Sequence, residues 1–254
     1  GYILTSTDNG STWIQKTSGT SNFLYGVTYG NSTFVAVGDN GTILTSTDNG
    51  TTWGSKTSGT TETLYGVTYD NSIFVAEGDN GTILTSSDGT TWTSRTSETT
   101  EGLRGITYEN STFVAVGESS TILTSSDGTS WYNRTSGTTR NLWDVIYGNS
   151  TFVAVGNSGT IRTSTDNGTT WDNRTYSKSK NFKGLTFDNS TFVTVGQSGY
   201  ILTSTDNGTT WDKKTSGTSN FLYGVTYGNS NFVAVGENGN ILTSTDKGTT
   251  WDNK

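Results

Sequence analysis

Short apolar runs, separated by turn residues, follow one another along the whole chain. Residues 22–58 contain three runs rich in β-branched and aromatic side chains and a more polar fourth run: Leu24–Tyr29, Thr33–Val37, Thr42–Ser46 and Thr52–Ser58. Such runs are typical of strands, and the Gly, Asn, Asp and Ser residues between them favour tight turns. The pattern has no helical period, so it predicts four short antiparallel strands in each unit.

The second of these strands carries apolar residues on both of its faces. Because successive side chains of a strand alternate, Phe34 and Ala36 point to one face of the predicted sheet, and Val35 and Val37 point to the other. Each sheet must therefore be covered on both sides by its neighbours. Radial packing of four-stranded units meets this requirement, so we predict an all-β fold, a β-propeller of four-stranded antiparallel blades.

One turn motif, Ser-x-Asp-(Asn)-Gly-x-Thr-Trp, marks the repeat. Its seven copies keep the Ser, Asp, Gly and Trp, and their tryptophans lie 39 or 40 residues apart. A fixed period of this size indicates a repeat architecture. The Asp and Trp residues of the seven copies are Asp8, Trp13, Asp48, Trp53, Asp88, Trp92, Asp127, Trp131, Asp166, Trp171, Asp206, Trp211, Asp246 and Trp251. We predict a single propeller domain over 1–254, with a first hairpin at 1–18 and repeat units at 22–58, 62–97, 101–136, 140–176, 180–216 and 220–254.

The motif resembles the Asp-box, or BNR repeat, of sialidase-like and photosystem II assembly-factor-like propellers, where it links the third and fourth strands of a blade. The resemblance covers the whole chain and implies a propeller in which the box is a structural device on the outer rim. In such a turn we expect Asp8 to accept backbone N–H bonds, Gly10 to take a positive φ, and Trp13 to pack between blades.

The number of blades is ambiguous because the chain both begins and ends with the same two strands. Segments for the first and second strands occur six times, whereas segments for the third and fourth strands occur seven times. Either 1–18 or 240–254 completes the last blade, and the other hairpin is left to form a half blade, to dangle, or to close the ring of a neighbouring molecule. We favour six blades, with seven as the alternative, and expect self-association through the redundant hairpin.

Composition excludes several classes of chemistry. The chain has a net charge of −7 and no basic cluster, which argues against nucleic acid and anionic membranes as partners. It contains no Cys and no His, so thiol nucleophiles, thiolate metal sites and the commonest general base are absent. The repeated Asp-Asn-Gly turns offer one carboxylate each, too few for a calcium site. We expect no cofactor, no metal and no membrane insertion.

A candidate binding surface emerges from comparing the repeats with one another. The turns between strands one and two barely vary, whereas the starts of the first strands diverge, on the predicted opposite face. The second residue of that strand is in turn Tyr25, Tyr65, Arg104, Trp143, Lys183 and Tyr223. Aromatic and cationic side chains around one mouth are typical of binding surfaces, although exposed loop positions also vary without function.

Two charged residues interrupt the apolar pattern inside predicted strands. Glu77 stands where Val37 and most of its counterparts carry valine, and Arg162 stands where Leu44 and its counterparts carry leucine. A buried charge needs a partner or a wet channel. We expect both residues to lie near strand ends, where their head groups reach solvent.

Three functions follow from these observations. The first is a non-catalytic binding or structural module of a prokaryotic cell surface or the extracellular space, with a glycan or protein ligand at the variable mouth. The second, from the assembly-factor resemblance, is a scaffold for a membrane protein complex. The third is a sialidase-type glycoside hydrolase, which needs convergent carboxylates and arginines. Arg95, Arg134 and Arg174 share one position on the outer strand, where they cannot converge on a central sugar carboxylate, so we expect no enzyme activity.

Overall fold

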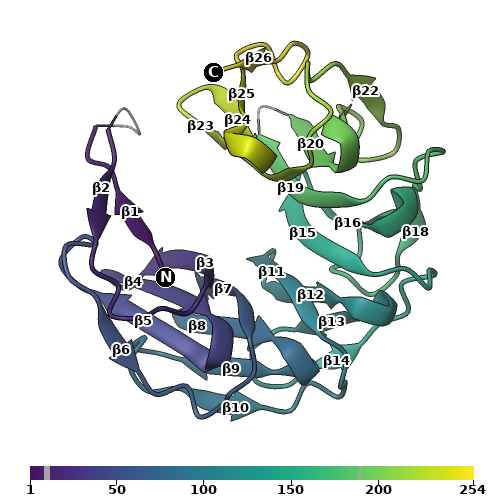
Figure 1. Cartoon of the computed structure of the whole chain (residues 1–254). Helices are drawn as coiled ribbons and strands as arrows, with labels where there is room; N and C mark the ends of the chain where they lie inside the picture. Colours follow the sequence, from purple (N-terminus) through teal and green to yellow (C-terminus); the bar gives the residue numbers. More distant parts are fainter. Residues whose placement is uncertain (9–11, 189) are drawn as a thin grey trace. The chain divides into compact units, whose positions relative to one another are not determined.

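The computed structural model describes residues 1–8, 12–188 and 190–254 as an all-β chain (Figure 1). The described residues form six four-stranded sheets and one two-stranded sheet. Within every four-stranded sheet the strands follow the order of the chain, and neighbours pair antiparallel, as β3 does with β4. The four-stranded meander predicted for each repeat is therefore confirmed.

The strands recur with similar bounds from repeat to repeat. The first strands are β3 (Leu24–Gly30), β7 (Leu64–Asp70), β11 (Leu103–Glu109), β15 (Leu142–Gly148), β19 (Phe182–Asp188) and β23 (Leu222–Gly228). The second strands are β4 (Thr33–Gly38), β8 (Ile73–Gly78), β12 (Thr112–Gly117), β16 (Thr151–Gly156), β20 (Thr191–Gly196) and β24 (Asn231–Gly236).

The third and fourth strands are shorter. The third strands are β5 (Thr42–Ser46), β9 (Ile83–Ser86), β13 (Ile122–Ser125), β17 (Ile161–Ser164), β21 (Ile201–Ser204) and β25 (Ile241–Ser244). The fourth strands are β6 (Gly54–Lys56), β10 (Thr93–Arg95), β14 (Tyr132–Asn133), β18 (Asp172–Asn173), β22 (Asp212–Lys214) and β26 (Asp252–Asn253).

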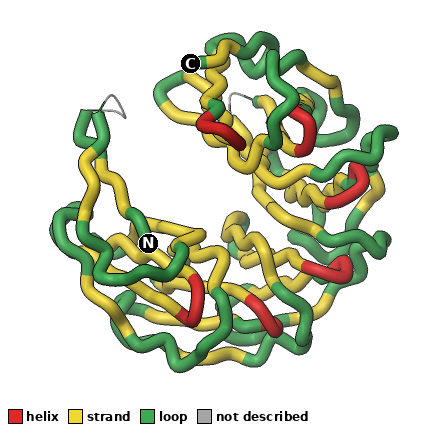
Figure 2. Tube along the Cα trace, viewed as in Figure 1, coloured by secondary structure: helices red, strands yellow, loops and turns green. Residues whose placement is uncertain are grey.

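A single 3₁₀ turn joins the second strand to the third in each repeat, and these turns are the red segments of Figure 2. They are η1 (Asp39–Gly41), η2 (Asp79–Gly81), η3 (Glu118–Ser120), η4 (Asn157–Gly159), η5 (Gln197–Gly199) and η6 (Glu237–Gly239). Their middle residue takes a positive φ, which is 52° at Asn40. The middle residue is Asn in η1, η2 and η6, and Asn tolerates this region better than most residues do; in the other three turns it is Ser.

The chain divides into two compact units. Unit 1 comprises Gly1–Phe113 and Ser125–Tyr132, and unit 2 comprises Val114–Thr124 and Asn133–Lys254.

The core consists of sheets packed face to face. In unit 1, one buried cluster joins residues of β4 and β5 to residues of the next sheet: Val35, Val37, Ile43, Leu64, Phe74, Ala76 and Leu84. In unit 2, the corresponding cluster is Val153, Val155, Ile161, Phe182, Leu185, Phe192 and Leu202. The valines of one second strand thus cover the Phe side of the next sheet, as the two apolar faces of that strand predict.

The favoured count of six blades is wrong, because the described residues form seven sheets. The last four-stranded sheet is completed by β25 and β26, while β1 (Ile3–Thr5) and β2 (Ile14–Lys16) pair only with each other. The local connection explains this outcome. The turn η6 joins β24 directly to β25, so closing that hairpin costs far less chain entropy than recruiting residues from the other end of the chain.

The acidic turn between the third and fourth strands is a closed hydrogen-bond network. The Ser46 hydroxyl donates to Asp48 Oδ1 at 2.8 Å, and Asp48 accepts the Thr52 N–H at 2.9 Å and the Thr52 hydroxyl at 2.6 Å. Hydrogen bonds from the Thr52 side chain and backbone lower the pKa of Asp48 to about 2. Gly50 takes a φ of 77°, as expected for this position, whereas Gly10 of the first copy lies outside the described residues.

The tryptophans of the acidic turns differ in burial. Trp131 is 4% exposed and Trp13 is 61% exposed, so the prediction that Trp13 packs between sheets is wrong. Trp131 lies 6.2 Å from Phe113, a residue of the second strand. The two-stranded sheet of β1 and β2 has no second strand, and Trp13 therefore has no such ring within its own sheet.

This difference predicts that two chemically identical substitutions have unequal effects on stability. Trp131→Ala removes a buried indole and should lower the free energy of unfolding by about 3–5 kcal/mol. Trp13→Ala, its matched control in the same motif, removes an exposed indole and should cost less than about 1 kcal/mol. Urea denaturation followed by circular dichroism measures both values, and equal losses would contradict the different burial of the two side chains.

Candidate functional site

Five of the six residues predicted to surround the mouth occupy β-bulges. In five repeats the pairing of the first and second strands shifts across the predicted residue, as between Leu24 and Gly26, which pair with Gly38 and Val37. The residue skipped in these five shifts is Tyr25, Tyr65, Trp143, Lys183 or Tyr223. A bulge leaves its extra residue out of the hydrogen-bonded pairing of the two strands and redirects its side chain. The candidate residues are therefore fixed to a sheet and do not lie on free loops.

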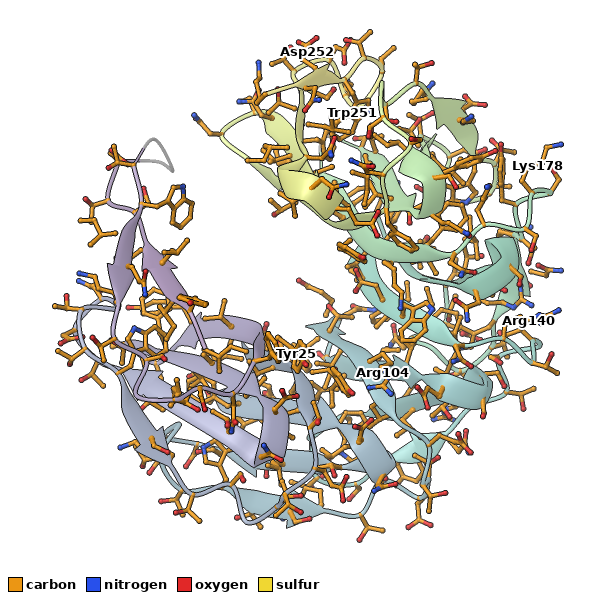
Figure 3. All side chains as sticks on the ribbon, viewed as in Figure 1. Tyr25, Arg104, Arg140, Lys178, Trp251 and Asp252 are labelled. Carbon is orange, nitrogen blue, oxygen red and sulfur yellow. The ribbon has the colours of Figure 1, made fainter. Side chains whose placement is uncertain are left out.

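Unit 1 places three of these side chains in contact, and we refer to Tyr25, Tyr65 and Arg104 as the unit 1 ladder (Tyr25 and Arg104 are labelled in Figure 3). The rings of Tyr25 and Tyr65 are 5.3 Å apart between centroids. The Arg104 guanidinium carbon lies 4.0 Å from the centroid of Tyr65, a cation–π distance. Arg104 also forms an ion pair of 3.0 Å with Asp79, which accepts the Tyr65 hydroxyl at 3.1 Å.

Burial and hydrogen bonding perturb the two tyrosines. Partial burial raises the pKa of Tyr65, opposed by the hydrogen bond and charge of Arg104. Partial burial, a hydrogen bond to Asp39 and the charge of Asp39 raise the pKa of Tyr25. Both phenols therefore stay protonated at neutral pH and act as hydrogen-bond donors to carboxylates.

Unit 2 holds the other three predicted residues. The Lys183 ammonium lies 2.8 Å from the centroid of the Trp143 ring, and the Trp143 indole donates to Asn157 Oδ1 at 2.6 Å. The Tyr223 hydroxyl donates to Glu237 Oε1 at 3.1 Å, and its ring stacks on Phe221 at 5.0 Å between centroids. Contacts between aromatic and cationic side chains thus recur within each unit.

One regularity of this surface was missed from the sequence. Each of these aromatic residues pairs with the first residue of the 3₁₀ turn fourteen positions later, as Tyr65 does with Asp79 and Trp143 does with Asn157. The residues at that turn position are Asp39, Asp79, Glu118, Asn157, Gln197 and Glu237. All six have side-chain oxygens that accept hydrogen bonds. This shared chemistry was a detectable signal, but only the bulge shows which side chain the oxygen meets.

The two charged residues inside strands are buried, so the expectation that their head groups reach solvent is wrong. Glu77 is 0% exposed and Arg162 is 4% exposed. The Arg162 guanidinium donates five hydrogen bonds, to Ser136 O, Ile161 O, Asn173 Oδ1, Thr175 Oγ1 and Gly137 O. Carbonyl and hydroxyl oxygens thus replace the water that a buried guanidinium loses, although burial still lowers its pKa.

Asp144 is a partly buried acid that the sequence analysis did not single out. Its counterparts in the other repeats are all glycine: Gly26, Gly66, Gly105, Gly184 and Gly224. The Asp144 carboxylate accepts the backbone N–H of Val145 and, from the neighbouring first strand β19, that of Leu185, both at 2.8 Å. Burial raises the pKa of Asp144 to about 7 in spite of these two hydrogen bonds.

The arginines of the outer strands have a structural setting. Each donates its Nε to a threonine of the neighbouring third strand, in the pairs Arg95 with Thr85, Arg134 with Thr124, and Arg174 with Thr163. In the part of the chain that the structure describes, no three Asp or Glu side chains gather closely enough to hold a metal ion. No helix among the described residues is long and apolar enough to cross a membrane.

Comparison with known proteins identifies the fold. No family model matches the chain, and no curated protein matches it. A structure of YCF48 bound to a D1 peptide is similar, with 18% sequence identity and a TM-score of 0.75 over 92% of this chain and 82% of that chain. YCF48 from Cyanidioschyzon merolae follows, at 16% identity and a TM-score of 0.73 over 92% and 85% of the two chains.

A third similar structure is the computationally designed Ika8 protein, at 11% identity and a TM-score of 0.71 over 90% of this chain and 74% of that chain. At these identities the comparisons show the fold alone, which is that of a β-propeller. The resemblance to Asp-box propellers therefore continues to depend on the residues of the acidic turns.

The elevated pKa of Asp144 predicts a pH-dependent stability. Its folded pKa of about 7 exceeds the usual 3.8, so the folded state binds the proton more tightly than the unfolded state. The contribution of Asp144 to stability should be fully present below about pH 4, fall as the pH rises to about 7, and then level off. The free energy of unfolding should fall by at most about 1.4 kcal/mol for each pH unit within this window. The carboxylates of the acidic turns have lowered pKa values, so their titration changes the stability only at pH values below this window.

Urea denaturation of the protein and of Asp144→Gly from about pH 4 to about pH 8 tests this linkage. The glycine variant carries the residue of the other repeats and should lose the decline, becoming more stable than the parent at the upper end. Asp144→Asn, which keeps the amide-accepting oxygen but does not titrate, should also show a flat profile. If the free energy of unfolding of both variants still falls with pH as steeply as that of the parent, a group other than Asp144 causes the pH dependence.

Proposed function

We propose that this chain is a non-catalytic β-propeller that binds a protein ligand, and that its unit 1 ladder receives a cationic side chain of that ligand. The arrangement of Arg104 carries the proposal. Its guanidinium lies over the Tyr65 ring at 4.0 Å and pairs with Asp79 at 3.0 Å. An aromatic face beside a carboxylate is a favourable environment for a guanidinium group.

The same pair of groups occurs at Tyr25 in a more open setting. Tyr25 is hydrogen-bonded to Asp39, as Tyr65 is to Asp79, but it is 51% exposed. In unit 2, Tyr223 bonds to Glu237 and is 53% exposed. Each pair therefore offers an accessible ring and a carboxylate, and the net charge of −7 favours the approach of basic segments.

The nature of the ligand separates two candidate functions. A role as a scaffold for a membrane protein complex is favoured by the similarity in fold to YCF48, one structure of which holds a D1 peptide. A glycan-binding surface module is favoured by the aromatic side chains of the ladder alone. The carboxylates beside the rings favour a protein ligand over a glycan. Composition also supports our proposal that the module acts outside the cell, since redox-sensitive Cys and Met are both absent.

Binding of short labelled peptides tests the ligand proposal. A peptide with two arginines should bind more tightly than its two-lysine version, and its two-glutamate version should not bind. Tyr25→Ala should weaken binding of the arginine peptide by about 2- to 30-fold, because it removes a cation–π contact. Asp39→Asn should also weaken this binding, because it removes the negative charge beside the ring. Fluorescence anisotropy over a salt series measures these values.

The matched control is Tyr132→Ala, which removes a 58% exposed tyrosine of the same unit outside the ladder. It should leave peptide binding unchanged. Equal affinity for the arginine and glutamate peptides would refute the proposal, and signals on a glycan array that disappear with Tyr25→Ala would favour the glycan-binding function in its place.

We also propose that the chain self-associates through the apolar faces at its two ends. Val235 and Ile241 of the last sheet are 46% and 44% exposed, whereas the corresponding Val195 and Ile201 are 0% exposed. At the other end, Leu4 is 54% exposed. Packing of the last sheet of one copy on the Leu4 side of the first hairpin of a second copy would bury both faces.

Sedimentation velocity over a range of protein concentrations tests self-association. The full chain should sediment as a dimer or larger species, and Val235→Glu should shift it toward the monomer. Deleting 1–18 should give a monomer with unchanged β content. A full chain that stays monomeric, together with a deletion that unfolds, would show that the first hairpin stabilises its own molecule.

A further inference from the structure

A pocket lies between the two-stranded sheet and the first four-stranded sheet, entirely within unit 1. Its volume is about 540 Å³, and its lining includes the strand β1 together with Leu24, Val27, Phe34 and Ala36. The β1 side is held in place by local contacts. The Ser18 hydroxyl donates to the Gly1 carbonyl at 2.6 Å, and Thr5 lies so close to Gly50 that an added Cβ there would meet it at 3.0 Å.

The next sheet shows what normally covers such a surface. There Leu64, Phe74 and Ala76 take the places of Leu24, Phe34 and Ala36, and they are completely buried. The side chains packed on them are Val35 and Val37 of a second strand and Ile43 of a third strand. For the first sheet, the two-stranded sheet supplies Ile3 in the place of Ile43 but no second strand.

Exposure shows that the first-strand side of this surface is uncovered in unit 1, although Ala36 is only 3% exposed. Val27 is 63% exposed and Tyr29 is 54% exposed. Their counterparts Val67 and Tyr69 are partly buried against the cluster of Val35, Val37 and Ile43. The same two residue types therefore differ in exposure only because a second strand covers one pair and not the other.

The strand β1 also has an unpaired edge. Each third strand of the four-stranded sheets pairs with a second strand on one side and a fourth strand on the other, whereas β1 pairs with β2 alone among the described residues. In the complete sheet of β4 and β5, Val35 faces Thr45, Ala36 faces Leu44 and Val37 faces Ile43. The corresponding edge of β1 is Ile3–Thr5.

We propose that this groove is an acceptor site for one extended segment from outside residues 1–254, with the alternation aromatic–Val–Ala–Val. The segment would add a strand to the free edge of β1 and place its two valines over Leu24, Phe34 and Ala36. Backbone hydrogen bonds to an open sheet edge provide affinity in such β-augmentation, and pockets for alternate side chains provide specificity. This site goes beyond the function proposed for the ladder and is built from different groups, apart from Tyr25, which lines both.

The numbers of strands exclude a second copy of residues 1–254 as a ready donor. The described residues contain six pairs of first and second strands, and all six are part of complete sheets. A copy that gave one pair away would open a sheet of its own and gain nothing. The head-to-tail packing proposed above also leaves the groove empty, because it contributes faces and no free strand. The occupant is therefore a segment from outside residues 1–254 with the pattern of the second strand.

A labelled synthetic peptide that copies residues 219–238 is the probe, since it contains one first and one second strand with their turn. It is added to the full chain at a concentration where sedimentation shows a monomer. We expect saturable binding by fluorescence anisotropy, together with slower amide hydrogen exchange in residues 3–5. The control peptide carries Val233→Asp and Val235→Asp at the two valines that would face the groove, and it should not bind.

Variants of the protein locate the site. Val27→Glu places a charge at an exposed position in the groove and should weaken binding of the peptide at least about tenfold. Val235→Glu is the matched control, because it changes an exposed valine outside the groove, and it should bind as the parent does. Asp39→Asn, which disturbs only the ladder, should also leave this binding unchanged, so that failure of the ladder proposal and failure of this one are distinguishable.

Three results would overturn the proposal. One is the absence of saturable binding, and another is binding that Val27→Glu leaves intact. The third is a stable dimer of the parent that Val27→Glu converts to a monomer and in which residues 3–5 are already protected, because a second copy would then occupy the groove.

Discussion

The whole structure depends on one constraint, which is that both faces of every second strand are apolar and must be covered. Val35 and Val37 pack on the next sheet, where they cover Phe74 on the Phe side of its second strand. Burial of such side chains contributes about 1.5–3 kcal/mol each, and no isolated sheet can gain it on both faces. Stability therefore resides in the contacts between sheets, and each repeat is folded only by virtue of its neighbours.

This constraint also explains where the chain departs from regularity. At two inner positions hydrogen bonds replace water around a polar group, as the five bonds of Arg162 and the two backbone N–H groups at Asp144 show. Gly26 and its counterparts occupy the position of Asp144 elsewhere, because first strands of adjacent sheets approach closely there. A Cβ on Gly26 would lie 2.9 Å from the carbonyl oxygen of Tyr65.

The ladder and the groove arise from the same repeat in two different ways. At the ladder, a bulge turns one residue per repeat out of the sheet, so variation there changes surface chemistry without disturbing the core. At the groove, the repeat itself is interrupted, because the sheet of β1 and β2 lacks the two strands that precede it elsewhere. The bulge allows the surface chemistry at the ladder to vary. The missing strands leave open, at the groove, a surface that is interior in the other repeats of unit 1.

The sequence by itself determined the strands, their order and the acidic turns, because these depend on alternation and turn chemistry within about ten residues. It also located Tyr25, Tyr65 and their counterparts at one repeated position. Only the tertiary structure decided that this position is a bulge, that Tyr65 meets both Arg104 and Asp79, and that Arg162 is buried among carbonyl oxygens. These outcomes depend on distances between strands of different sheets, which no local pattern contains. The same reason applies to the seventh sheet: two hairpins of nearly identical sequence competed for one place, and chain connectivity through η6 selected β25 and β26.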